Sequence, residues 1–116
     1  MDFKGKCIVV TGAASGIGLH LVQALIKRGD CLVCAVDRDI HGLKRLRTRY
    51  GRCIFTHFCN VSKPNELDAL LSVLYTPKGH WPGYVDIFIS NAGFGYYEKL
   101  EKPDWRHIEA IFQTNF

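Results

Sequence analysis

The stretch TGAASGIG (residues 11–18) places glycines at positions 12, 16 and 18, in the spacing G-x-x-x-G-x-G. It follows KCIVVT (6–11), a continuous run of strand-forming residues, and leads into IGLHLVQALIKRG (17–29), whose apolar residues recur at helical spacing. Gly29 stands where a helix usually ends. The stripe expected to face a core comprises Ile17, Leu21, Val22, Leu25 and Ile26. These residues predict a buried strand, a glycine-rich turn and an amphipathic helix in direct succession.

The same alternation of strand and helix continues to about residue 90. The expected elements are a strand at 31–36, a helix at 40–50, a strand at 53–58, a helix at 65–75 and a strand at 84–90. Ser62 is the expected cap of the last of these helices, Pro64 stands at its start, and TPKGHWPG (76–83) is an expected loop. Near-continuous apolar strands, each followed by a helix, indicate a parallel sheet covered on both faces. The predicted fold is therefore α/β, a doubly wound parallel sheet of the Rossmann type with four strands present.

Composition places the chain among ordinary globular proteins. Its 116 residues are 47% hydrophobic and 22% charged. No apolar run approaches the roughly 18 residues that a membrane helix needs. Five cysteines, an odd number, indicate free thiols in a reducing compartment, so a cytoplasmic protein without membrane contact is expected. Cys31 and Cys34 have C-x-x-C spacing, but residues three apart in a strand point to opposite faces, so no metal site is predicted.

The net charge of +4 comes largely from LKRLRTRYGR (43–52). Leu43, Leu46 and Tyr50 recur at helical spacing and are expected to face the core, with basic side chains on the other side. Those basic side chains are Lys44, Arg45, Arg47 and Arg49. A solvated helix face is the favoured interpretation. A nucleic-acid surface is the alternative, but it lacks the interleaved aromatic residues that stack on bases, so no nucleic-acid partner is predicted.

A glycine-rich turn between a buried strand and a helix is suited to bind a phosphate group. Glycine permits unusual backbone angles and close approach, and the helix N-terminus adds partial positive charge. No Gly-Lys-Ser/Thr follows, which excludes a P-loop. Asp37, at the end of the second expected strand, is placed to accept hydrogen bonds from both adenosine ribose hydroxyls, and its charge repels a 2'-phosphate. NAD is therefore predicted as the cofactor ahead of NADP, although a guanidinium at Arg38 could hold a 2'-phosphate.

Further motifs extend this pattern along the chain. Together, TGAASGIG, Asp37, NAG (91–93) and TNF (114–116) resemble the classical short-chain dehydrogenase/reductase family in order and spacing. The resemblance implies an NAD(P)-dependent oxidoreductase that moves hydride between a nicotinamide and an alcohol or carbonyl carbon. It also implies that the cofactor is lined by Gly12, Ser15, Gly16, Ile17 and Gly18, with Asp37 at the ribose.

The resemblance also assigns residues that follow the third and fourth strands. Asn60 and Val61 match the position beside the adenine, where the family more often has Asp than Asn. Asn91 is expected to hold the fourth strand to the glycine-rich turn, while Ala92 and Gly93 let the backbone pass close to the cofactor. The substrate stays open among alcohols, sugars, steroids and acyl thioesters.

The family's catalytic group is represented in this chain by Asn115 alone, which the resemblance implies holds a water in the proton relay. The acid/base of the family is the tyrosine of Tyr-x-x-x-Lys, and none of the five tyrosines here is followed by lysine four residues later. The run KPDWRHIEAIFQTNF (102–116) has helical spacing without an end signal, so the chain is expected to stop inside a helix.

Residues 1–116 are therefore expected to be the N-terminal dinucleotide-binding part of a single Rossmann domain, incomplete and truncated within a helix. Such a chain would bind the cofactor without turning over a substrate. Its parent enzyme is expected to be a homo-oligomer that acts on a small molecule. The alternatives are a catalytically silent nucleotide-binding module and a decayed gene product.

Overall fold

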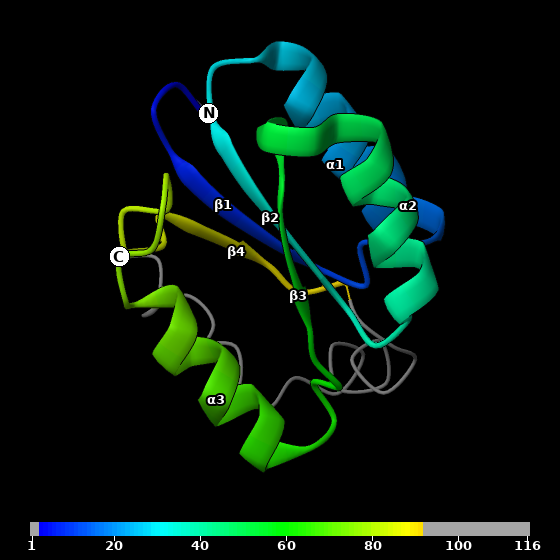
Figure 1. Ribbon diagram of the computed structural model, residues 1–116, viewed down its shortest axis with the longest axis vertical. Helices are drawn as coiled ribbons and strands as arrows, with labels where there is room; N and C mark the ends of the chain where they lie inside the picture. Colours follow the sequence, from blue (N-terminus) through cyan, green and yellow to red (C-terminus); the bar gives the residue numbers. More distant parts are fainter. Residues whose placement is uncertain (1–2, 92–116) are drawn as a thin grey trace, which may run out of the picture.

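A computed structural model describes residues 3–91 of the chain, which form one parallel sheet with helices on both faces (Figure 1). The strands and helices follow the predicted alternation. They are β1 (Cys7–Thr11), α1 (Gly16–Arg28), β2 (Leu32–Asp37), α2 (Ile40–Tyr50), a 3-10 turn (Gly51–Cys53), β3 (Phe55–Phe58), α3 (Pro64–Leu74) and β4 (Ile87–Ile89). The predicted α/β class is confirmed. The helix expected at 102–116 lies outside the described residues.

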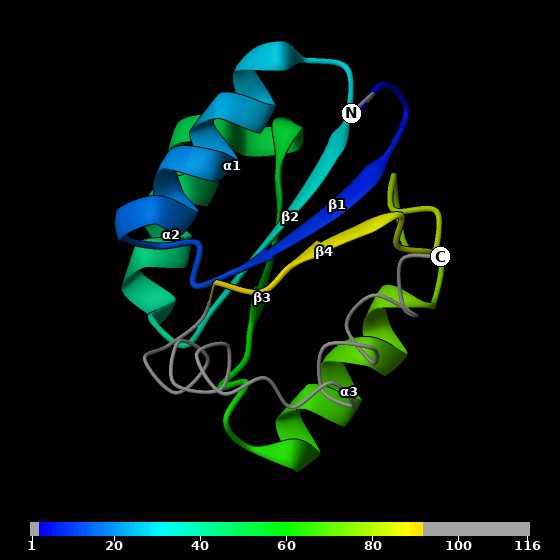
Figure 2. The same cartoon turned by 180° about the vertical axis from the view of Figure 1, so that it is seen from behind.

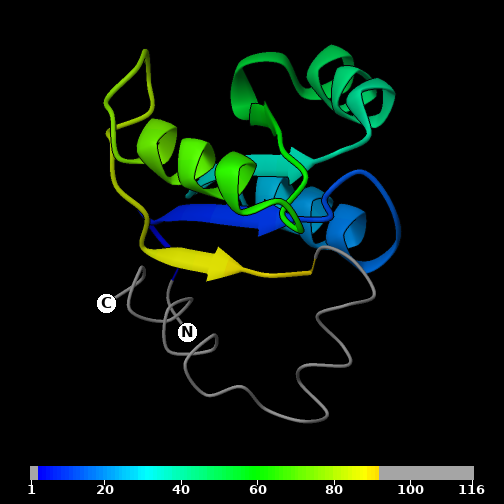
Figure 3. The ribbon, with the colours of Figure 1, turned by 90° about the horizontal axis from the view of Figure 1, so that it is seen from below.

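The strand order of the sheet is β3-β2-β1-β4, and every pairing is parallel. The arrowheads of β1, β2 and β4 accordingly point the same way in Figure 3. Thr11 lies opposite Val36, and Val10 lies opposite Ile89, so β1 has a neighbour on each side. The order of the strands reverses at β1, since β2 and β3 extend to one side and β4 to the other. Ligands of open α/β sheets bind at the carboxyl ends of the strands beside such a reversal.

Two hydrophobic clusters occupy the two faces of the sheet. One face contacts α1 and α2, which lie together in Figures 1 and 2, and the other contacts α3. Residues of β1 alternate between them: Ile8 and Val10 join the first cluster, and Cys7 and Val9 join the second. All five residues of β1 are buried, as expected for a strand covered on both faces. The continuous apolar run in the sequence thus reflects the two helix layers.

The helical face predicted for α1 is partly wrong. Ile17 is 63% exposed, and the buried residues of the helix are Gly18, Val22 and Leu25. Because α1 begins at Gly16, Ile17 lies in its first turn, beyond the end of the sheet that the rest of the helix covers. The left-handed cap predicted at Gly29 is confirmed, with φ 73°.

The cap predicted for α3 is also wrong. Lys63 holds the N-cap position without a side-chain hydrogen bond, and Pro64 begins the helix. Ser62 instead donates its N–H and its hydroxyl to Asn60 Oδ1, at 3.1 and 2.6 Å. The Ser62 hydroxyl therefore binds the Asn60 side chain in a local turn instead of capping the helix.

The orientation predicted for α2 is confirmed. Leu43 and Leu46 are buried in the first cluster and Tyr50 packs against it, while the basic side chains are exposed. Arg45 pairs with Asp39 at 3.7 Å, and the guanidinium carbon of Arg49 lies 5.3 Å from the centroid of the Tyr50 ring. The basic residues thus lie on the exposed face of the helix, as predicted.

The loop before β4 carries a buried residue that the sequence did not reveal. Trp81 is 5% exposed and donates its indole N–H to the carbonyl of Leu74 at 2.8 Å. Its ring meets Phe55 edge-on, with centroids 5.3 Å apart. A loop tryptophan therefore closes the end of the cluster beneath α3.

The described cysteines are free thiols, as predicted. Cys34 belongs to the cluster under α3, while Cys31 packs against the cluster under α1 and α2, so the two lie on opposite faces. Within residues 3–91 no group of His, Cys, Asp and Glu side chains could hold a metal ion. Over the same residues, no helix combines the length and apolar character needed to cross a bilayer.

Burial of Cys34 makes stability depend on pH. Burial raises the pKa of this thiol from 9.0 to about 12, so the folded state keeps a proton that the unfolded state loses. The contribution of Cys34 is constant below about pH 9 and falls by up to about 1.4 kcal/mol per pH unit as the pH rises toward the folded pKa. Urea unfolding of wild type and Cys34→Ala at several pH values from 8 to about 11 tests this. The stability difference between the two proteins is expected to shift against wild type as pH rises, and parallel curves would contradict the assignment.

Candidate functional site

The candidate site is the carboxyl edge of the sheet, where the strands end at Thr11, Asp37, Phe58 and Ile89. The register places Thr11 beside the end of β2, and Asp37 opposite Phe58. The glycine turn leaves β1 at this edge and enters α1. The site therefore combines the strand reversal, a helix N-terminus and an acidic residue in one place.

Glycine is required at three points of the turn for two different reasons. Gly12 and Gly16 have φ values of 64° and 55°, in the left-handed region that side chains disfavour. Gly18 is needed for space. A Cβ there would lie 2.1 Å from the carbonyl oxygen of Gly12 and 2.6 Å from Nδ2 of Asn91. The N-terminus of α1 thus packs directly on the turn and on Asn91, two residues after β4.

A buried threonine links the turn to β4. Thr11 is 1% exposed, and its hydroxyl accepts the N–H of Asn91 at 2.9 Å and donates to the carbonyl of Ile89 at 3.5 Å. The main-chain N–H of Asn91 therefore ties the chain after β4 to the end of β1, where the glycine turn begins. Sequence reasoning assigned no role to Thr11, although a lone hydroxyl at the end of an apolar strand is a usable signal.

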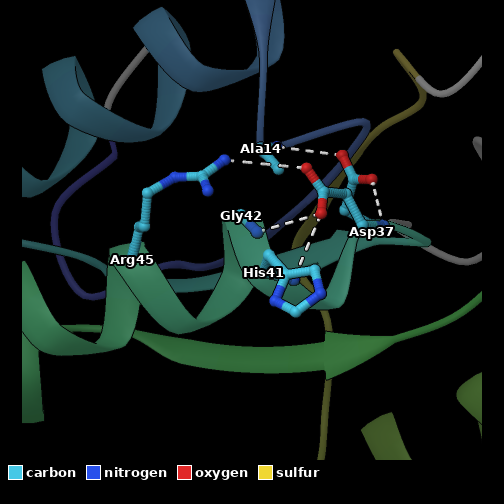
Figure 4. Close-up of polar contacts among 6 residues, drawn as sticks. Ala14, Asp37, His41, Gly42 and Arg45 are labelled. Atoms are coloured by element: carbon cyan, nitrogen blue, oxygen red, sulfur yellow. Dashed lines mark hydrogen bonds and ion pairs between the residues drawn. The ribbon is translucent and has the colours of Figure 1, made fainter.

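Asp37 joins the glycine turn to the start of α2 (Figure 4). Its Oδ2 accepts the N–H of Ala14 at 2.9 Å, and its Oδ1 accepts the N–H of Asp39 at 2.8 Å. Each carboxylate oxygen has a second lone pair, so the group can still accept two hydrogen bonds from a ligand. The carboxylate is thus fixed in orientation and remains able to bind a diol.

The first turn of α2 was not recognised as part of this site. Asp39 caps the helix, and its Oδ1 accepts the N–H groups of His41 and Gly42 at 3.1 Å each, while Oδ2 meets Arg45 (Figure 4). A Cβ at Gly42 would lie 2.5 Å from the Cβ of Ala14. An Asp before a helical pattern and an isolated Gly inside it are the signals that could have indicated this contact.

Asn60 and Val61 follow β3 at the same edge. The N–H of Cys59 donates to the carbonyl of Asp37 at 3.0 Å. Asn60, the next residue, therefore lies close to Asp37, which is predicted to bind the ribose. Asn60 Oδ1 is already bonded to Ser62, and its N–H donates to Glu66 Oε1 at 3.1 Å. The amide oxygen proposed for the adenine therefore has local partners, while Val61 packs against the cluster under α3.

Cys59 lies within this edge but is not suited to act as a nucleophile. It is 2% exposed, and burial, with a smaller effect of the nearby Glu66 carboxylate, raises the pKa of its thiol. A protonated, covered thiol is a poor nucleophile at neutral pH.

The structure brings together most of the residues predicted to contact a cofactor. At the carboxyl edge lie Gly12, Ser15, Gly16, Ile17, Gly18, Asp37, Asn60, Val61 and Asn91. The predicted positions Ala92, Gly93 and Asn115 lie outside the described residues. The first turn of α1 contains no acidic residue, and Ser15 makes no side-chain cap hydrogen bond. The first turn of α1 therefore supplies no carboxylate of its own to neutralise the positive end of the helix.

The chain is similar to one protein family and to several individual proteins. The model of the family "short chain dehydrogenase" matches residues 6–116. An uncharacterized oxidoreductase of Staphylococcus saprophyticus is 31% identical over 92% of this chain and 43% of its own length. A benzil reductase, (S)-benzoin forming, of Saccharomyces cerevisiae is 31% identical over 97% of this chain and 44% of its own length. The chain thus spans less than half the length of these relatives.

Among solved structures, L-sorbose reductase from Gluconobacter frateurii, complexed with NADPH and L-sorbose, is similar with a TM-score of 0.66. It is 27% identical, and the match covers 79% of this chain and 35% of that one.

Proposed function

Because the chain belongs to the short chain dehydrogenase family, we propose that the carboxyl edge of its sheet binds a nicotinamide adenine dinucleotide, with NAD preferred to NADP. The observation that carries the proposal is the hydrogen bond between Ala14 and Asp37, which holds a carboxylate against a glycine turn. An acid in this position suits a ribose diol, and the turn suits a pyrophosphate.

The residues of the turn fit such a ligand. Because Gly12 and Gly16 carry no side chain, a phosphate group can approach the main chain of the turn closely. The N-terminus of α1 contributes its partial positive charge. Ile17, exposed in the first turn, offers an apolar surface beside the phosphates. These residues would bind and orient the ligand, and none of them takes part in proton transfer.

The preference for NAD follows from charge and hydrogen bonding at Asp37. The two oxygens retain lone pairs for the 2' and 3' hydroxyls, whereas a 2'-phosphate there would meet a negative charge. Arg38 and Arg45 are exposed nearby and favour the opposite choice, and the similar sorbose reductase was solved with NADPH. The geometry of the carboxylate supports the choice of NAD, since both of its oxygens are fixed by main-chain donors.

For the whole protein we propose hydride transfer between the nicotinamide, which supplies or accepts the hydride, and an alcohol or carbonyl carbon of a small molecule. Residues 1–116 contain no Tyr-x-x-x-Lys, so we assign to them only the cofactor-binding part of this activity. This assignment separates two measurable properties, binding and turnover.

Changing Asp37 tests the nucleotide preference. Wild type is expected to bind NADH at least about tenfold more tightly than NADPH, and Asp37→Asn is expected to weaken NADH binding by about tenfold or more, because hydrogen bonds to a charged group are lost. Titrations followed by nucleotide fluorescence, with ADP-ribose as competitor, measure both constants. Asp68→Asn, an exposed change on α3, is the matched control and should bind as wild type.

Two results would contradict the proposal at different levels. Equal affinities for NADH and NADPH in wild type, or a preference for NADPH, would remove Asp37 from its assigned role. Failure of wild type to bind either nucleotide, in a protein with a cooperative thermal transition, would exclude the binding site itself.

A further inference from the structure

Gly42 in the first turn of α2 contacts Ala14 of the glycine turn, next to the candidate site. A Cβ at Gly42 would stand 2.5 Å from Ala14 Cβ and 2.8 Å from Asp39 Oδ2, so the helix approaches the glycine turn as closely as glycine permits. Both partners are near Asp37: Ala14 donates its N–H to one carboxylate oxygen, and Asp39, which donates to the other, directly precedes α2.

The two donors that fix Asp37 come from separate segments. Ala14 belongs to the turn between β1 and α1, and Asp39 caps α2 (Figure 4). The carboxylate keeps both hydrogen bonds only while the turn and the first turn of α2 stay at their present separation. The Gly42–Ala14 contact sets that separation, because the Ala14 methyl group meets the backbone of α2 at a residue that has no side chain of its own.

We infer that Gly42 is a positioning residue for dinucleotide selection: its close contact with Ala14 holds the two main-chain donors that orient Asp37. The inference rests on the proposed nucleotide site. Moving α2 away from the turn frees the carboxylate and weakens its bonds to a ribose diol. NADPH, which gains nothing from Asp37, loses less affinity than NADH.

Helix propensity alone predicts that Gly42→Ala is favourable, whereas the contact with Ala14 predicts that it is harmful. Alanine is the better helix former, so Gly42→Ala would stabilise α2 if nothing contacted the residue. The crowding at Ala14 is relieved in the double variant Ala14→Gly/Gly42→Ala, which moves the methyl group from one side of the contact to the other. Thr48→Ala, on the exposed part of the same helix, is the matched control.

The experiment measures NADH and NADPH dissociation constants for wild type, Gly42→Ala, the double variant and Thr48→Ala, together with their melting temperatures. Gly42→Ala is expected to weaken NADH binding about tenfold and NADPH binding by less than about threefold, so the preference falls. The double variant is expected to recover the wild-type preference to within about threefold. Thr48→Ala should change neither constant.

An NADH affinity of folded Gly42→Ala within about twofold of wild type would overturn the inference, and so would equal losses for both nucleotides. If Gly42→Ala alone does not fold, the double variant carries the test, since it must fold and still prefer NADH. Wild type that binds neither nucleotide would overturn the proposed function and this inference with it, whereas normal wild-type binding with an unaffected Gly42→Ala overturns the inference alone.

Discussion

Replacing Gly18 by alanine is expected to weaken NADH binding by about 100-fold and to lower the free energy of unfolding by about 2 to 3 kcal/mol. The new Cβ would lie 2.1 Å from the Gly12 carbonyl oxygen and 2.6 Å from Asn91 Nδ2, and neither contact is tolerable. The first obstacle is backbone, so α1 and the turn must separate. Separation displaces both the helix N-terminus and the main-chain donors that would face the phosphates.

Nucleotide titration and urea unfolding of the same preparations test this expectation. Gly29→Ala, at the other end of α1, is the matched control, because a Cβ there meets nothing within 4 Å and only its φ of 73° is unfavourable. This control should lose about 1 kcal/mol of stability and keep its affinity for NADH. Gly18→Ala with wild-type affinity would show that the close packing of α1 on the turn does not position the site.

Trp81→Ala is expected to lower the free energy of unfolding by about 3 to 5 kcal/mol, the largest single effect among the substitutions considered. The change empties the end of the cluster under α3, where Trp81 is 5% exposed and packs edge-on against Phe55. It also leaves the carbonyl of Leu74, at the end of α3, without the indole N–H. The melting temperature should fall by at least about 12 °C.

Trp81→Phe separates the two parts of this effect. Phenylalanine keeps an aromatic ring in the cluster but removes the donor to Leu74, so a loss of about 1 to 2 kcal/mol is expected. Thermal unfolding by circular dichroism measures both variants against wild type. A loss below about 1 kcal/mol for Trp81→Ala would mean that the loop before β4 does not close the core.

The elements were predictable because their signals are local. A continuous apolar run marks β1, helical spacing marks the buried face of α2, and glycine ends α1 at the predicted residue. The errors arose where two local preferences compete. Ser62 was expected to cap α3, but its hydroxyl binds the Asn60 side chain, and Ile17 fits the helical pattern yet lies beyond the sheet.

Much of the candidate site was also visible in the sequence, since the turn and Asp37 are each recognisable by their place after a strand. What the sequence did not reveal is how these parts hold one another. Thr11 and Asn91 are 80 residues apart, and Ala14 and Asp37 are 23 apart, yet each pair is hydrogen-bonded. No local pattern encodes such pairs, because they depend on which strands become neighbours.

Short segments of the sequence are enough to predict the order of strands and helices, the two-sided burial of β1 and the glycine turn, because backbone preference and hydrophobic period act over a few residues. The pairing of β4 with β1, the entry of Trp81 into the core from a loop and the contact of Gly42 with Ala14 arise when the layers pack together. These contacts join segments distant in the chain, and their geometry is fixed by how the layers pack rather than by any one segment.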